Sequence, residues 1–211
     1  MVKIRAFDPS SIEQPHGLSG FAWPSTFKDG APWDLEIGCG VGWHPIQYAK
    51  ANKDRRLIAI EHTREKFEKF AGRVDRHPEL SNILPVHADA MRWVTHAIPA
   101  ESVDRVFLLY PNPEPKASNK RWLRMPFFQR LLEIMKPGAT LTLATNIESY
   151  FQEALEYGQK AWGLELVETR SFKLEDELPG LPRTHFEKKY LVRGETCFDV
   201  TFRKARATLR P

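Results

Sequence analysis

The sequence predicts one α/β domain in which helices cover both faces of a mostly parallel β-sheet. Segments typical of strands alternate five times with segments of helical spacing, an order that favours a doubly wound sheet. The chain has 211 residues, which suits a single domain, and its 42% hydrophobic residues suffice for a core. No apolar run approaches the roughly 20 residues that a membrane span needs. We therefore expect a cytoplasmic protein that makes no membrane contact.

Residues 1–31 are expected to form an irregular N-terminal arm, because prolines and glycines recur along them. Three aromatic residues, Phe21, Trp23 and Phe27, are the candidates to anchor this arm on the domain. The domain itself is expected to span residues 32–211, and it contains no internal repeat.

The first half of the domain alternates strictly between strands and helices. Residues 43–52 carry apolar side chains at helical spacing, and Pro45 is tolerated in a first helical turn. The helix that begins at Arg64 ends before Pro78. The clearest buried strand is 102–110, which has a turn at each end. The expected strands are 33–37, 56–61, 84–87 and 102–110, and the expected helices are 43–52, 64–77 and 89–94.

The second half closes the sheet with two strands that resemble an antiparallel pair. The expected elements are a helix over 124–135, a strand over 140–145, a helix over 147–162 and strands over 164–169 and 196–202. The segment Lys136-Pro137-Gly138 is expected to stop the first of these helices. Residues 172–194 read as a long polar loop, and a loop of that length in a compact domain is usually functional or disordered. The sequence thus predicts a seven-stranded sheet whose last strand is antiparallel.

A glycine-rich turn follows the first expected strand. Gly38, Gly40 and Gly42 stand at every second position between strand 33–37 and helix 43–52. Glycine permits positive φ and a close approach of a ligand to the backbone. A strand, a glycine turn and a helix in this order are typical of a nucleotide-type binding corner, although a plain tight turn would show the same glycines.

Charged and bulky residues around this turn narrow the choice of ligand. A dinucleotide-binding turn needs a small residue where Trp43 stands. Glu36 would repel a pyrophosphate but could attract a cation. Glu61 ends the second strand, where a carboxylate can accept two hydrogen bonds from ribose hydroxyls. These residues favour S-adenosylmethionine (SAM), which carries an ammonium group and a sulfonium.

Basic residues gather in one stretch, although the formal net charge is only +4. Between residues 115 and 132, Lys116, Lys120, Arg121 and Arg124 occur without an acid among them. They could neutralise RNA phosphates, or they could form a solvated face. The two cysteines indicate no disulfide framework, and the scattered histidines indicate no metal site.

Several segments together resemble the bacterial tRNA (guanine-N7)-methyltransferases, which are class I SAM-dependent enzymes. The segments are Glu36–Gly40, Ile60-Glu61, Ala88-Asp89-Ala90, Pro111-Asn112-Pro113-Glu114-Pro115-Lys116, Leu143–Asn146, Arg183–Glu187 and Phe198–Arg203. The glycine turn alone indicates only a SAM enzyme, whereas the proline loop together with the Thr-x-Phe-Glu segment is far more specific to this family. The resemblance implies a Rossmann-like class I methyltransferase fold.

The resemblance also implies roles for individual residues. The implied cofactor contacts are Glu36, Gly38, Gly40, Gly42, Glu61, Asp89 and Asn112. The implied substrate contacts are Lys116, Asn146, Thr184 and Glu187. The active-site position of the family falls on Asn112. The family usually carries an aspartate where Asn112 and Asn146 stand, and a tryptophan where Glu114 stands.

These departures leave more than one function open. The leading hypothesis is SAM-dependent methyl transfer to RNA, at N7 of a guanine in tRNA. The alternatives are a methyltransferase with another acceptor (another RNA position, a protein or a small molecule) and a catalytically silent SAM-fold protein that binds RNA. A further hypothesis is that Glu114 takes over part of the work of the missing acid, and the alternative is a solvated loop residue. The sequence predicts no oligomeric state.

Overall fold

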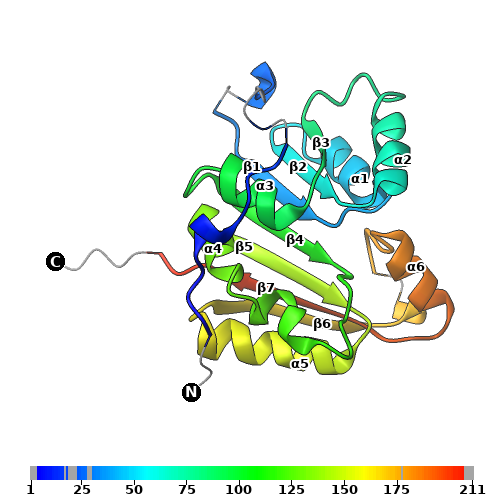
Figure 1. The fold of residues 1–211 in the computed structure, drawn as a ribbon. Helices are drawn as coiled ribbons and strands as arrows, with labels where there is room; N and C mark the ends of the chain where they lie inside the picture. The colour runs from blue at the N-terminus through cyan, green and yellow to red at the C-terminus, as the bar shows by residue number, and fades with distance from the viewer. Residues whose placement is uncertain (1–3, 17, 19–22, 28–29, 177, 207–211) are drawn as a thin grey trace.

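The computed structural model describes residues 4–16, 18, 23–27, 30–176 and 178–206, and it confirms the predicted sheet (Figure 1). Its seven strands lie in the order β3-β2-β1-β4-β5-β7-β6. The first five strands are parallel, and β7 is antiparallel to both of its neighbours. The strands are β1 (Trp33–Ile37), β2 (Arg56–Glu61), β3 (Ile83–His87), β4 (Val103–Leu109), β5 (Met135–Thr145), β6 (Glu165–Phe172) and β7 (Cys197–Arg203).

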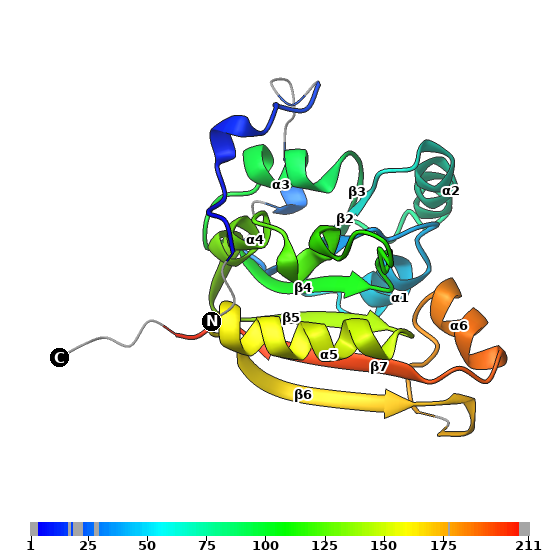
Figure 2. The ribbon, with the colours of Figure 1, turned by 60° about the horizontal axis from the view of Figure 1, so that its bottom comes forward.

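Helices cover both faces of this sheet. The helices are α1 (Trp43–Ala51), α2 (Arg64–Val74), α3 (Ala90–Ala97), α4 (Phe128–Ile134), α5 (Glu148–Glu156) with its π-helical continuation Tyr157–Ala161, and α6 (His185–Val192). Short 3₁₀ turns occur at Pro9–Ser11, Ser25–Phe27, Ser118–Lys120, Trp122–Arg124 and Leu174–Asp176. The helices α1 and α2 pack on β2 and β3, whereas α4 and α5 pack on β5 (Figures 1 and 2).

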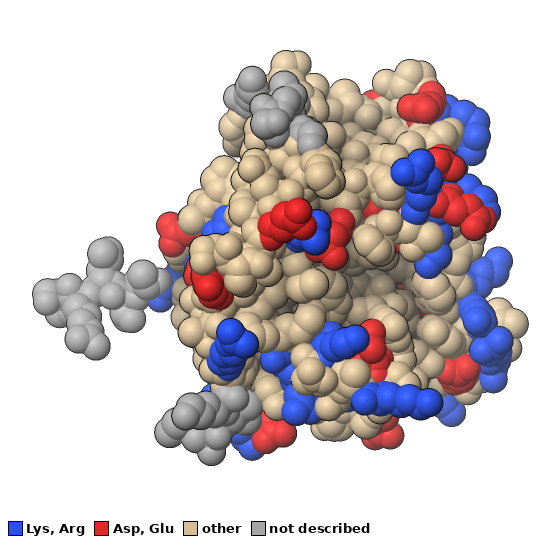
Figure 3. All heavy atoms as spheres, viewed as in Figure 1, with Lys and Arg blue, Asp and Glu red and all other residues tan. Residues whose placement is uncertain are grey.

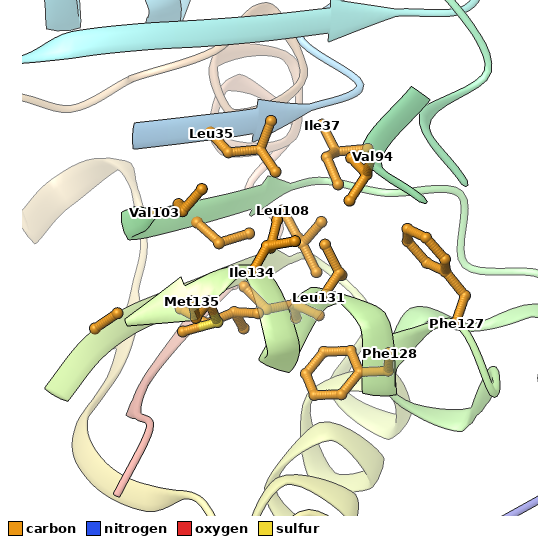
Figure 4. Packing of buried hydrophobic residues seen from close by; sticks show 14 of the residues in the cluster. Leu35, Ile37, Val94, Val103, Leu108, Phe127, Phe128, Leu131, Ile134 and Met135 are labelled. Carbon is orange, nitrogen blue, oxygen red and sulfur yellow. The ribbon is translucent and has the colours of Figure 1, made fainter. Parts of the chain in front are cut away.

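The larger core lies between the sheet and the helices α3, α4 and α5. Leu35 of β1 and Leu108 of β4 are fully buried there against Leu131 of α4 (Figure 4). A smaller core on the opposite face joins Leu57 of β2 to Phe70 of α2. Because β2 is buried on both faces, its sequence is almost continuously apolar, as expected for a central parallel strand.

The helix predicted over 124–135 is shorter than expected. Helical geometry is disfavoured for the residue before a proline, and Met125 takes an extended conformation before Pro126. The helix α4 therefore begins only at Phe128 and ends at Ile134. The strand β5 follows at once from Met135, so the predicted stop signal lies just after the helix, in the irregular first part of this strand.

The segment 172–194, expected to be a long polar loop, contains the helix α6. Thr184 caps this helix, since its Oγ1 accepts a hydrogen bond from the backbone N–H of Glu187 at 3.0 Å. Thr-x-x-Glu is the sequence signature of a helix start, so the helix was detectable from its cap. In both ribbon views α6 lies next to the ends of β4 and β5 (Figures 1 and 2).

The N-terminal arm contacts the domain through two of the three expected aromatic residues. The ring of Trp23 lies 4.5 Å from that of Trp33, and Phe27 is only 3% exposed. Phe21 lies outside the described residues. Among the described helices, none is long and apolar enough to cross a bilayer.

Candidate active site

A cleft of about 910 Å³ opens at the carboxyl ends of the parallel strands, where ligands bind in open α/β sheets. It brings together five of the predicted site residues, Gly38, Glu61, Asp89, Asn112 and Asn146. They come from the ends of β1, β2, β3, β4 and β5, so sheet topology alone gathers them. Figure 3 shows this face hollowed near its centre, with acidic and basic side chains around the rim.

A second cavity of about 460 Å³ adjoins the cleft at the glycine turn. Its lining includes the predicted residues Glu36, Gly40 and Thr184, and it shares Gly38, Lys66 and Phe186 with the cleft. The ammonium of Lys66 lies 5.9 Å from the ring centre of Phe186. This contact between α2 and α6 stands where the two cavities meet.

The glycine turn is open toward the cavities at two positions. Gly38 and Gly40 have φ of +77° and +62°, and a Cβ at either would meet nothing within 4 Å. The backbone N–H groups of Gly38 and Cys39 donate to the carbonyl of Ile60, which fixes the turn against β2. A ligand can therefore approach this backbone closely.

At Gly42, packing against α2 and not access to a cavity requires glycine. It lines neither cavity, and a Cβ built on it would lie 2.1 Å from the ring of Phe70. The close packing of the glycine turn against α2 thus requires Gly42. The cofactor contact implied for Gly42 finds no support in this geometry.

Two buried carboxylates flank the turn. Glu61 is 6% exposed, and its two oxygens accept hydrogen bonds from the backbone N–H groups of Gly40 at 2.8 Å and Thr63 at 2.7 Å. Glu36 is 2% exposed, with an oxygen 2.7 Å from Nδ1 of His44. One carboxylate lines each cavity, and Lys66, Lys69 and Arg73 also line the second cavity. The two cavities therefore suit a ligand that carries both positive and negative groups and is long enough to span both.

The other side of the cleft suits a flat apolar group. Asp89 caps α3, where its Oδ1 accepts from the backbone N–H of Arg92 at 2.9 Å. Its neighbours Ala88, Ala90 and Met91 also line the cleft. A carboxylate beside small and apolar side chains is compatible with an adenine ring and its amino group.

The proline loop places its polar side chains on the cleft. The side-chain amide of Asn112 donates to a carboxylate oxygen of Glu114 at 2.9 Å, and both residues line the cleft. Glu114 has φ of +46°, a conformation that non-glycine residues rarely adopt. Lys116 is exposed and lines neither cavity. Asn146, on the facing loop, donates to Glu195 at 2.7 Å.

The basic stretch after the loop divides into two groups. Arg121 donates to the carbonyl of Pro113 at 2.7 Å, and it shares the carboxylate of Glu153 with Arg124, each at 3.2 Å. Both arginines are therefore paired within the protein, and Arg121 also braces the backbone of the loop. Lys116 and Lys120 are exposed beside the cleft.

Thr184 and Glu187 differ in whether they line a cavity. Thr184 lines the second cavity, whereas Glu187 is fully buried and lines neither cavity. Glu187 accepts a hydrogen bond from the hydroxyl of Tyr110 at 2.7 Å and forms an ion pair with Arg183. Burial raises the pKa of Glu187, but the hydrogen bonds and charge of Arg183 outweigh it and hold the pKa below its ordinary value.

Among the side chains that line the site and that sequence reasoning missed are Lys66, Met91, Tyr110 and Phe186. Tyr110 was detectable, because it ends the clearest strand and directly precedes the proline loop. Phe186 would have followed from the helix cap at Thr184. No local pattern singles out Lys66 or Met91, since each occurs within an ordinary amphipathic helix.

Known proteins share this sequence over most of its length. The model of a methyltransferase family, Methyltransf_4, matches residues 30–200. The tRNA (guanine-N(7)-)-methyltransferase of Roseobacter denitrificans is 33% identical over 181 residues, which cover 85% of this chain and 76% of that protein. The protein of the same name from Paracoccus denitrificans is 33% identical over 184 residues, covering 86% and 76%.

Solved structures are similar in fold. A 16S rRNA (adenine(1408)-N(1))-methyltransferase from Catenulisporales acidiphilia superposes with a TM-score of 0.65 at 17% identity, covering 99% of this chain and 96% of that one. A SAM-dependent methyltransferase from Aquifex aeolicus has a TM-score of 0.55 at 19% identity, covering 93% and 98%. At such identities the likeness concerns the arrangement of the sheet and its helices.

Proposed function

The chain belongs to the tRNA (guanine-N(7)-)-methyltransferase family, and from this premise we propose that it methylates N7 of a guanine in tRNA with SAM as methyl donor. The observation that carries the proposal is the cleft itself. One continuous surface joins Gly38, Glu61 and Asp89, which suit the donor, to Asn112 and Glu114, which suit an acceptor base. We place this activity in the cytoplasm, where tRNA is available.

SAM, when bound, supplies a methyl group on a positively charged sulfur. Glu61 is held in place by the N–H groups of Gly40 and Thr63, so its carboxylate is oriented before a ribose binds. Glu36 and the cations Lys66, Lys69 and Arg73 line the second cavity, where the ammonium and carboxylate of the donor would lie. Asp89 and the apolar residues beside it would hold the adenine.

The acceptor needs no general base. Guanine N7 carries a lone pair and no proton at neutral pH, so the protein must only align this atom with the methyl group. The proline loop is suited to alignment, because Arg121 braces its backbone and Glu114 fixes the side chain of Asn112. Glu114 would accept hydrogen bonds from the N–H groups on the other edge of the guanine.

RNA contact is supported by cations on both sides of the site. Lys116 and Lys120 are exposed at the proline loop, and Lys66 and Lys188 are exposed on α2 and α6. Lys188 lies 5.7 Å from the ring centre of Trp43, beside the second cavity. Cations around an aromatic-lined opening are suited to phosphates and bases.

The deciding experiment incubates the purified protein with methyl-labelled SAM and total tRNA, then maps the methylated base. Label at guanine N7 is expected. Label at another RNA position, or on protein or small molecules only, would overturn the acceptor and favour the alternative that Asn112 and Asn146 suggest. Binding of SAM without any transfer would overturn the enzymatic proposal.

A further inference from the structure

A buried network of hydrogen-bonded polar side chains lies beneath α6. The hydroxyl of Tyr110 donates to Glu187 at 2.7 Å, and the guanidinium of Arg183 bonds to the same carboxylate. Arg183 also donates to one oxygen of Asp199 at 2.7 Å, and Arg170 donates to the other at 2.6 Å. Glu187, Asp199 and Tyr110 are each less than a tenth exposed. An unpaired buried member weakens such a network. Nε of Arg170 is buried without a hydrogen-bond partner, whereas the carboxylates of Glu187 and Asp199 are paired.

One end of this hydrogen-bond network contacts the proline loop. Tyr110 stands between β4 and Pro111, and its φ of +53° is unusual for a residue with a bulky side chain. It is held there from both ends, since its backbone N–H donates to the carbonyl of Ala144 at 2.8 Å and its hydroxyl donates to Glu187. A residue in such a conformation persists when its surroundings over-determine it. Tyr110 therefore sets the direction in which the loop leaves the sheet.

The other end of the hydrogen-bond network contacts α6, which lines the second cavity. The helix α6 carries Glu187 on its buried side and Phe186, which lines both cavities, on its exposed side. His185 packs edge to face on Trp43, with ring centres 4.3 Å apart. The same helix thus touches the glycine-turn side of the site and, through Tyr110, the proline loop.

We propose that Glu187 is a positioning residue, which acts through Tyr110 to align the proline loop with α6, and not a substrate contact. Its burial is complete, and its carboxylate oxygens are occupied by Tyr110 and Arg183. A substrate could reach this carboxylate only by displacing those partners. The catalytic part of this inference rests on the proposed function, whereas the alignment of the loop does not.

The test replaces Tyr110 by phenylalanine, which removes the hydroxyl and keeps the ring. Tyr48→Phe is a matched control, because the Tyr48 hydroxyl also donates to a buried carboxylate, that of Asp34, at 2.7 Å. Asp34 is likewise paired with an arginine, Arg55, and Tyr48 lines neither cavity. Both variants lose a hydroxyl that donates to a buried carboxylate, and the Tyr48 hydroxyl also accepts from Arg105 at 2.8 Å. Only the loss at Tyr110 touches the proline loop.

For Tyr110→Phe we expect kcat on tRNA to fall about tenfold, with KM for tRNA and Kd for SAM changed by less than about twofold. Hydrogen exchange of the amides in residues 112–124 and 185–192 should accelerate about tenfold, because the bond that joins these segments is gone. Tyr48→Phe should leave kcat and the exchange of both segments unchanged. Unchanged exchange in Tyr110→Phe would overturn the proposal even if the protein proved to methylate another acceptor.

A second pair of variants separates positioning from substrate contact. Glu187→Gln keeps an acceptor for the Tyr110 hydroxyl, so it should retain more of kcat than Glu187→Ala, and both should keep KM for tRNA. A rise in KM for tRNA in Glu187→Gln, with Tyr110→Phe behaving as wild type, would assign Glu187 to substrate binding and overturn the inference.

Discussion

A hydrogen bond within the proline loop, from Asn112 to Glu114, positions the negatively charged carboxylate of the loop. Asn112 is neutral, but its amide holds the carboxylate of Glu114 at 2.9 Å on the wall of the cleft. The charge that the family usually carries at the position of Asn112 is thus present two residues further along. The left-handed backbone of Glu114, with φ of +46°, turns its side chain back toward Asn112.

Replacing Glu114 by glutamine tests whether this charge matters. We expect kcat/KM for tRNA to fall about tenfold, since charge-assisted hydrogen bonds are roughly twice as strong as neutral ones. Titration calorimetry should show an unchanged Kd for SAM. Glu101→Gln is the control, because Glu101 is an exposed glutamate with a similar φ of +49° in the turn before β4. Equal activity in both variants would assign Glu114 to the solvated surface.

Two glycines of the same turn should respond differently to alanine. Gly38 and Gly42 have nearly equal φ, +77° and +83°, so the backbone strain of a Cβ is the same at both. Only at Gly42 does the Cβ strike the ring of Phe70. Gly42→Ala should therefore lower the free energy of unfolding by about 2 kcal/mol more than Gly38→Ala does.

The ligand affinity of these two variants should show the reverse order. Gly38→Ala places a methyl group toward the open cavity and should weaken SAM binding, which calorimetry measures at a temperature where both variants are folded. Urea titration gives the free energies of unfolding. Similar stability losses in the two variants would contradict the packing role of Gly42.

At the scale of elements, the ion pair between Glu187 of α6 and Arg183 stabilises the position of α6. Burial raises the pKa of Glu187, but the hydrogen bonds and charge of Arg183 and the hydrogen bond from Tyr110 together outweigh it, so the folded-state pKa lies below the ordinary value of about 4.3. A group of this kind contributes stability that is complete above its unfolded pKa. That contribution is lost as the pH falls through the folded pKa.

We therefore expect wild type to lose more stability than Glu187→Gln as the pH is lowered below about 4.3. Urea unfolding at a series of pH values measures both free energies. At neutral pH the variant should be the less stable of the two, and the difference should narrow in acid. A difference that is constant with pH would show that the Glu187 carboxylate has the same pKa in the folded and unfolded chains.

Some parts of the site can be predicted from the sequence because they lie at strand ends, whereas others depend on how the elements pack. The ends of β1, β2 and β3 place Gly38, Glu61 and Asp89 at one edge of the sheet, and strand ends can be read from local spacing. The brace of the proline loop cannot be read in this way. Arg121 and Arg124 meet at Glu153 of α5, beyond α4 and β5 in the chain, and only packing determines that both charges pair with this carboxylate.

At the scale of the whole molecule, ligand binding should appear as added stability. A ligand that binds only the folded chain stabilises it by about 2.7 kcal/mol at one hundred times its Kd. For a domain of this size SAM should then raise Tm by roughly 5–10 °C in differential scanning fluorimetry. Glu61→Gln should show a smaller rise at the same SAM concentration, because its side chain loses the charge. No rise in wild type would contradict SAM as the cofactor.

The charge distribution of the molecule should set the salt dependence of RNA binding. Lys120 is exposed beside the cleft, so Lys120→Gln should reduce the slope of log K against log salt by about one. Lys53 is exposed in the turn before β2, at the opposite edge of the sheet, and Lys53→Gln should leave the slope unchanged. Filter binding of tRNA at several salt concentrations measures the slopes. Equal slopes for the two variants would remove Lys120 from the RNA-binding surface.

From the sequence alone follow the seven-stranded sheet, the glycine turn and the acids at the strand ends. These depend on the alternation of apolar residues and on parallel topology, which brings the carboxyl ends of consecutive strands to one edge. The tertiary structure alone decided that Gly42 packs on Phe70 and that Glu187 bonds to Tyr110, 77 residues away. The physical reason is that both depend on which surfaces meet when helices pack on the sheet, and the spacing of residues along the chain does not encode those contacts.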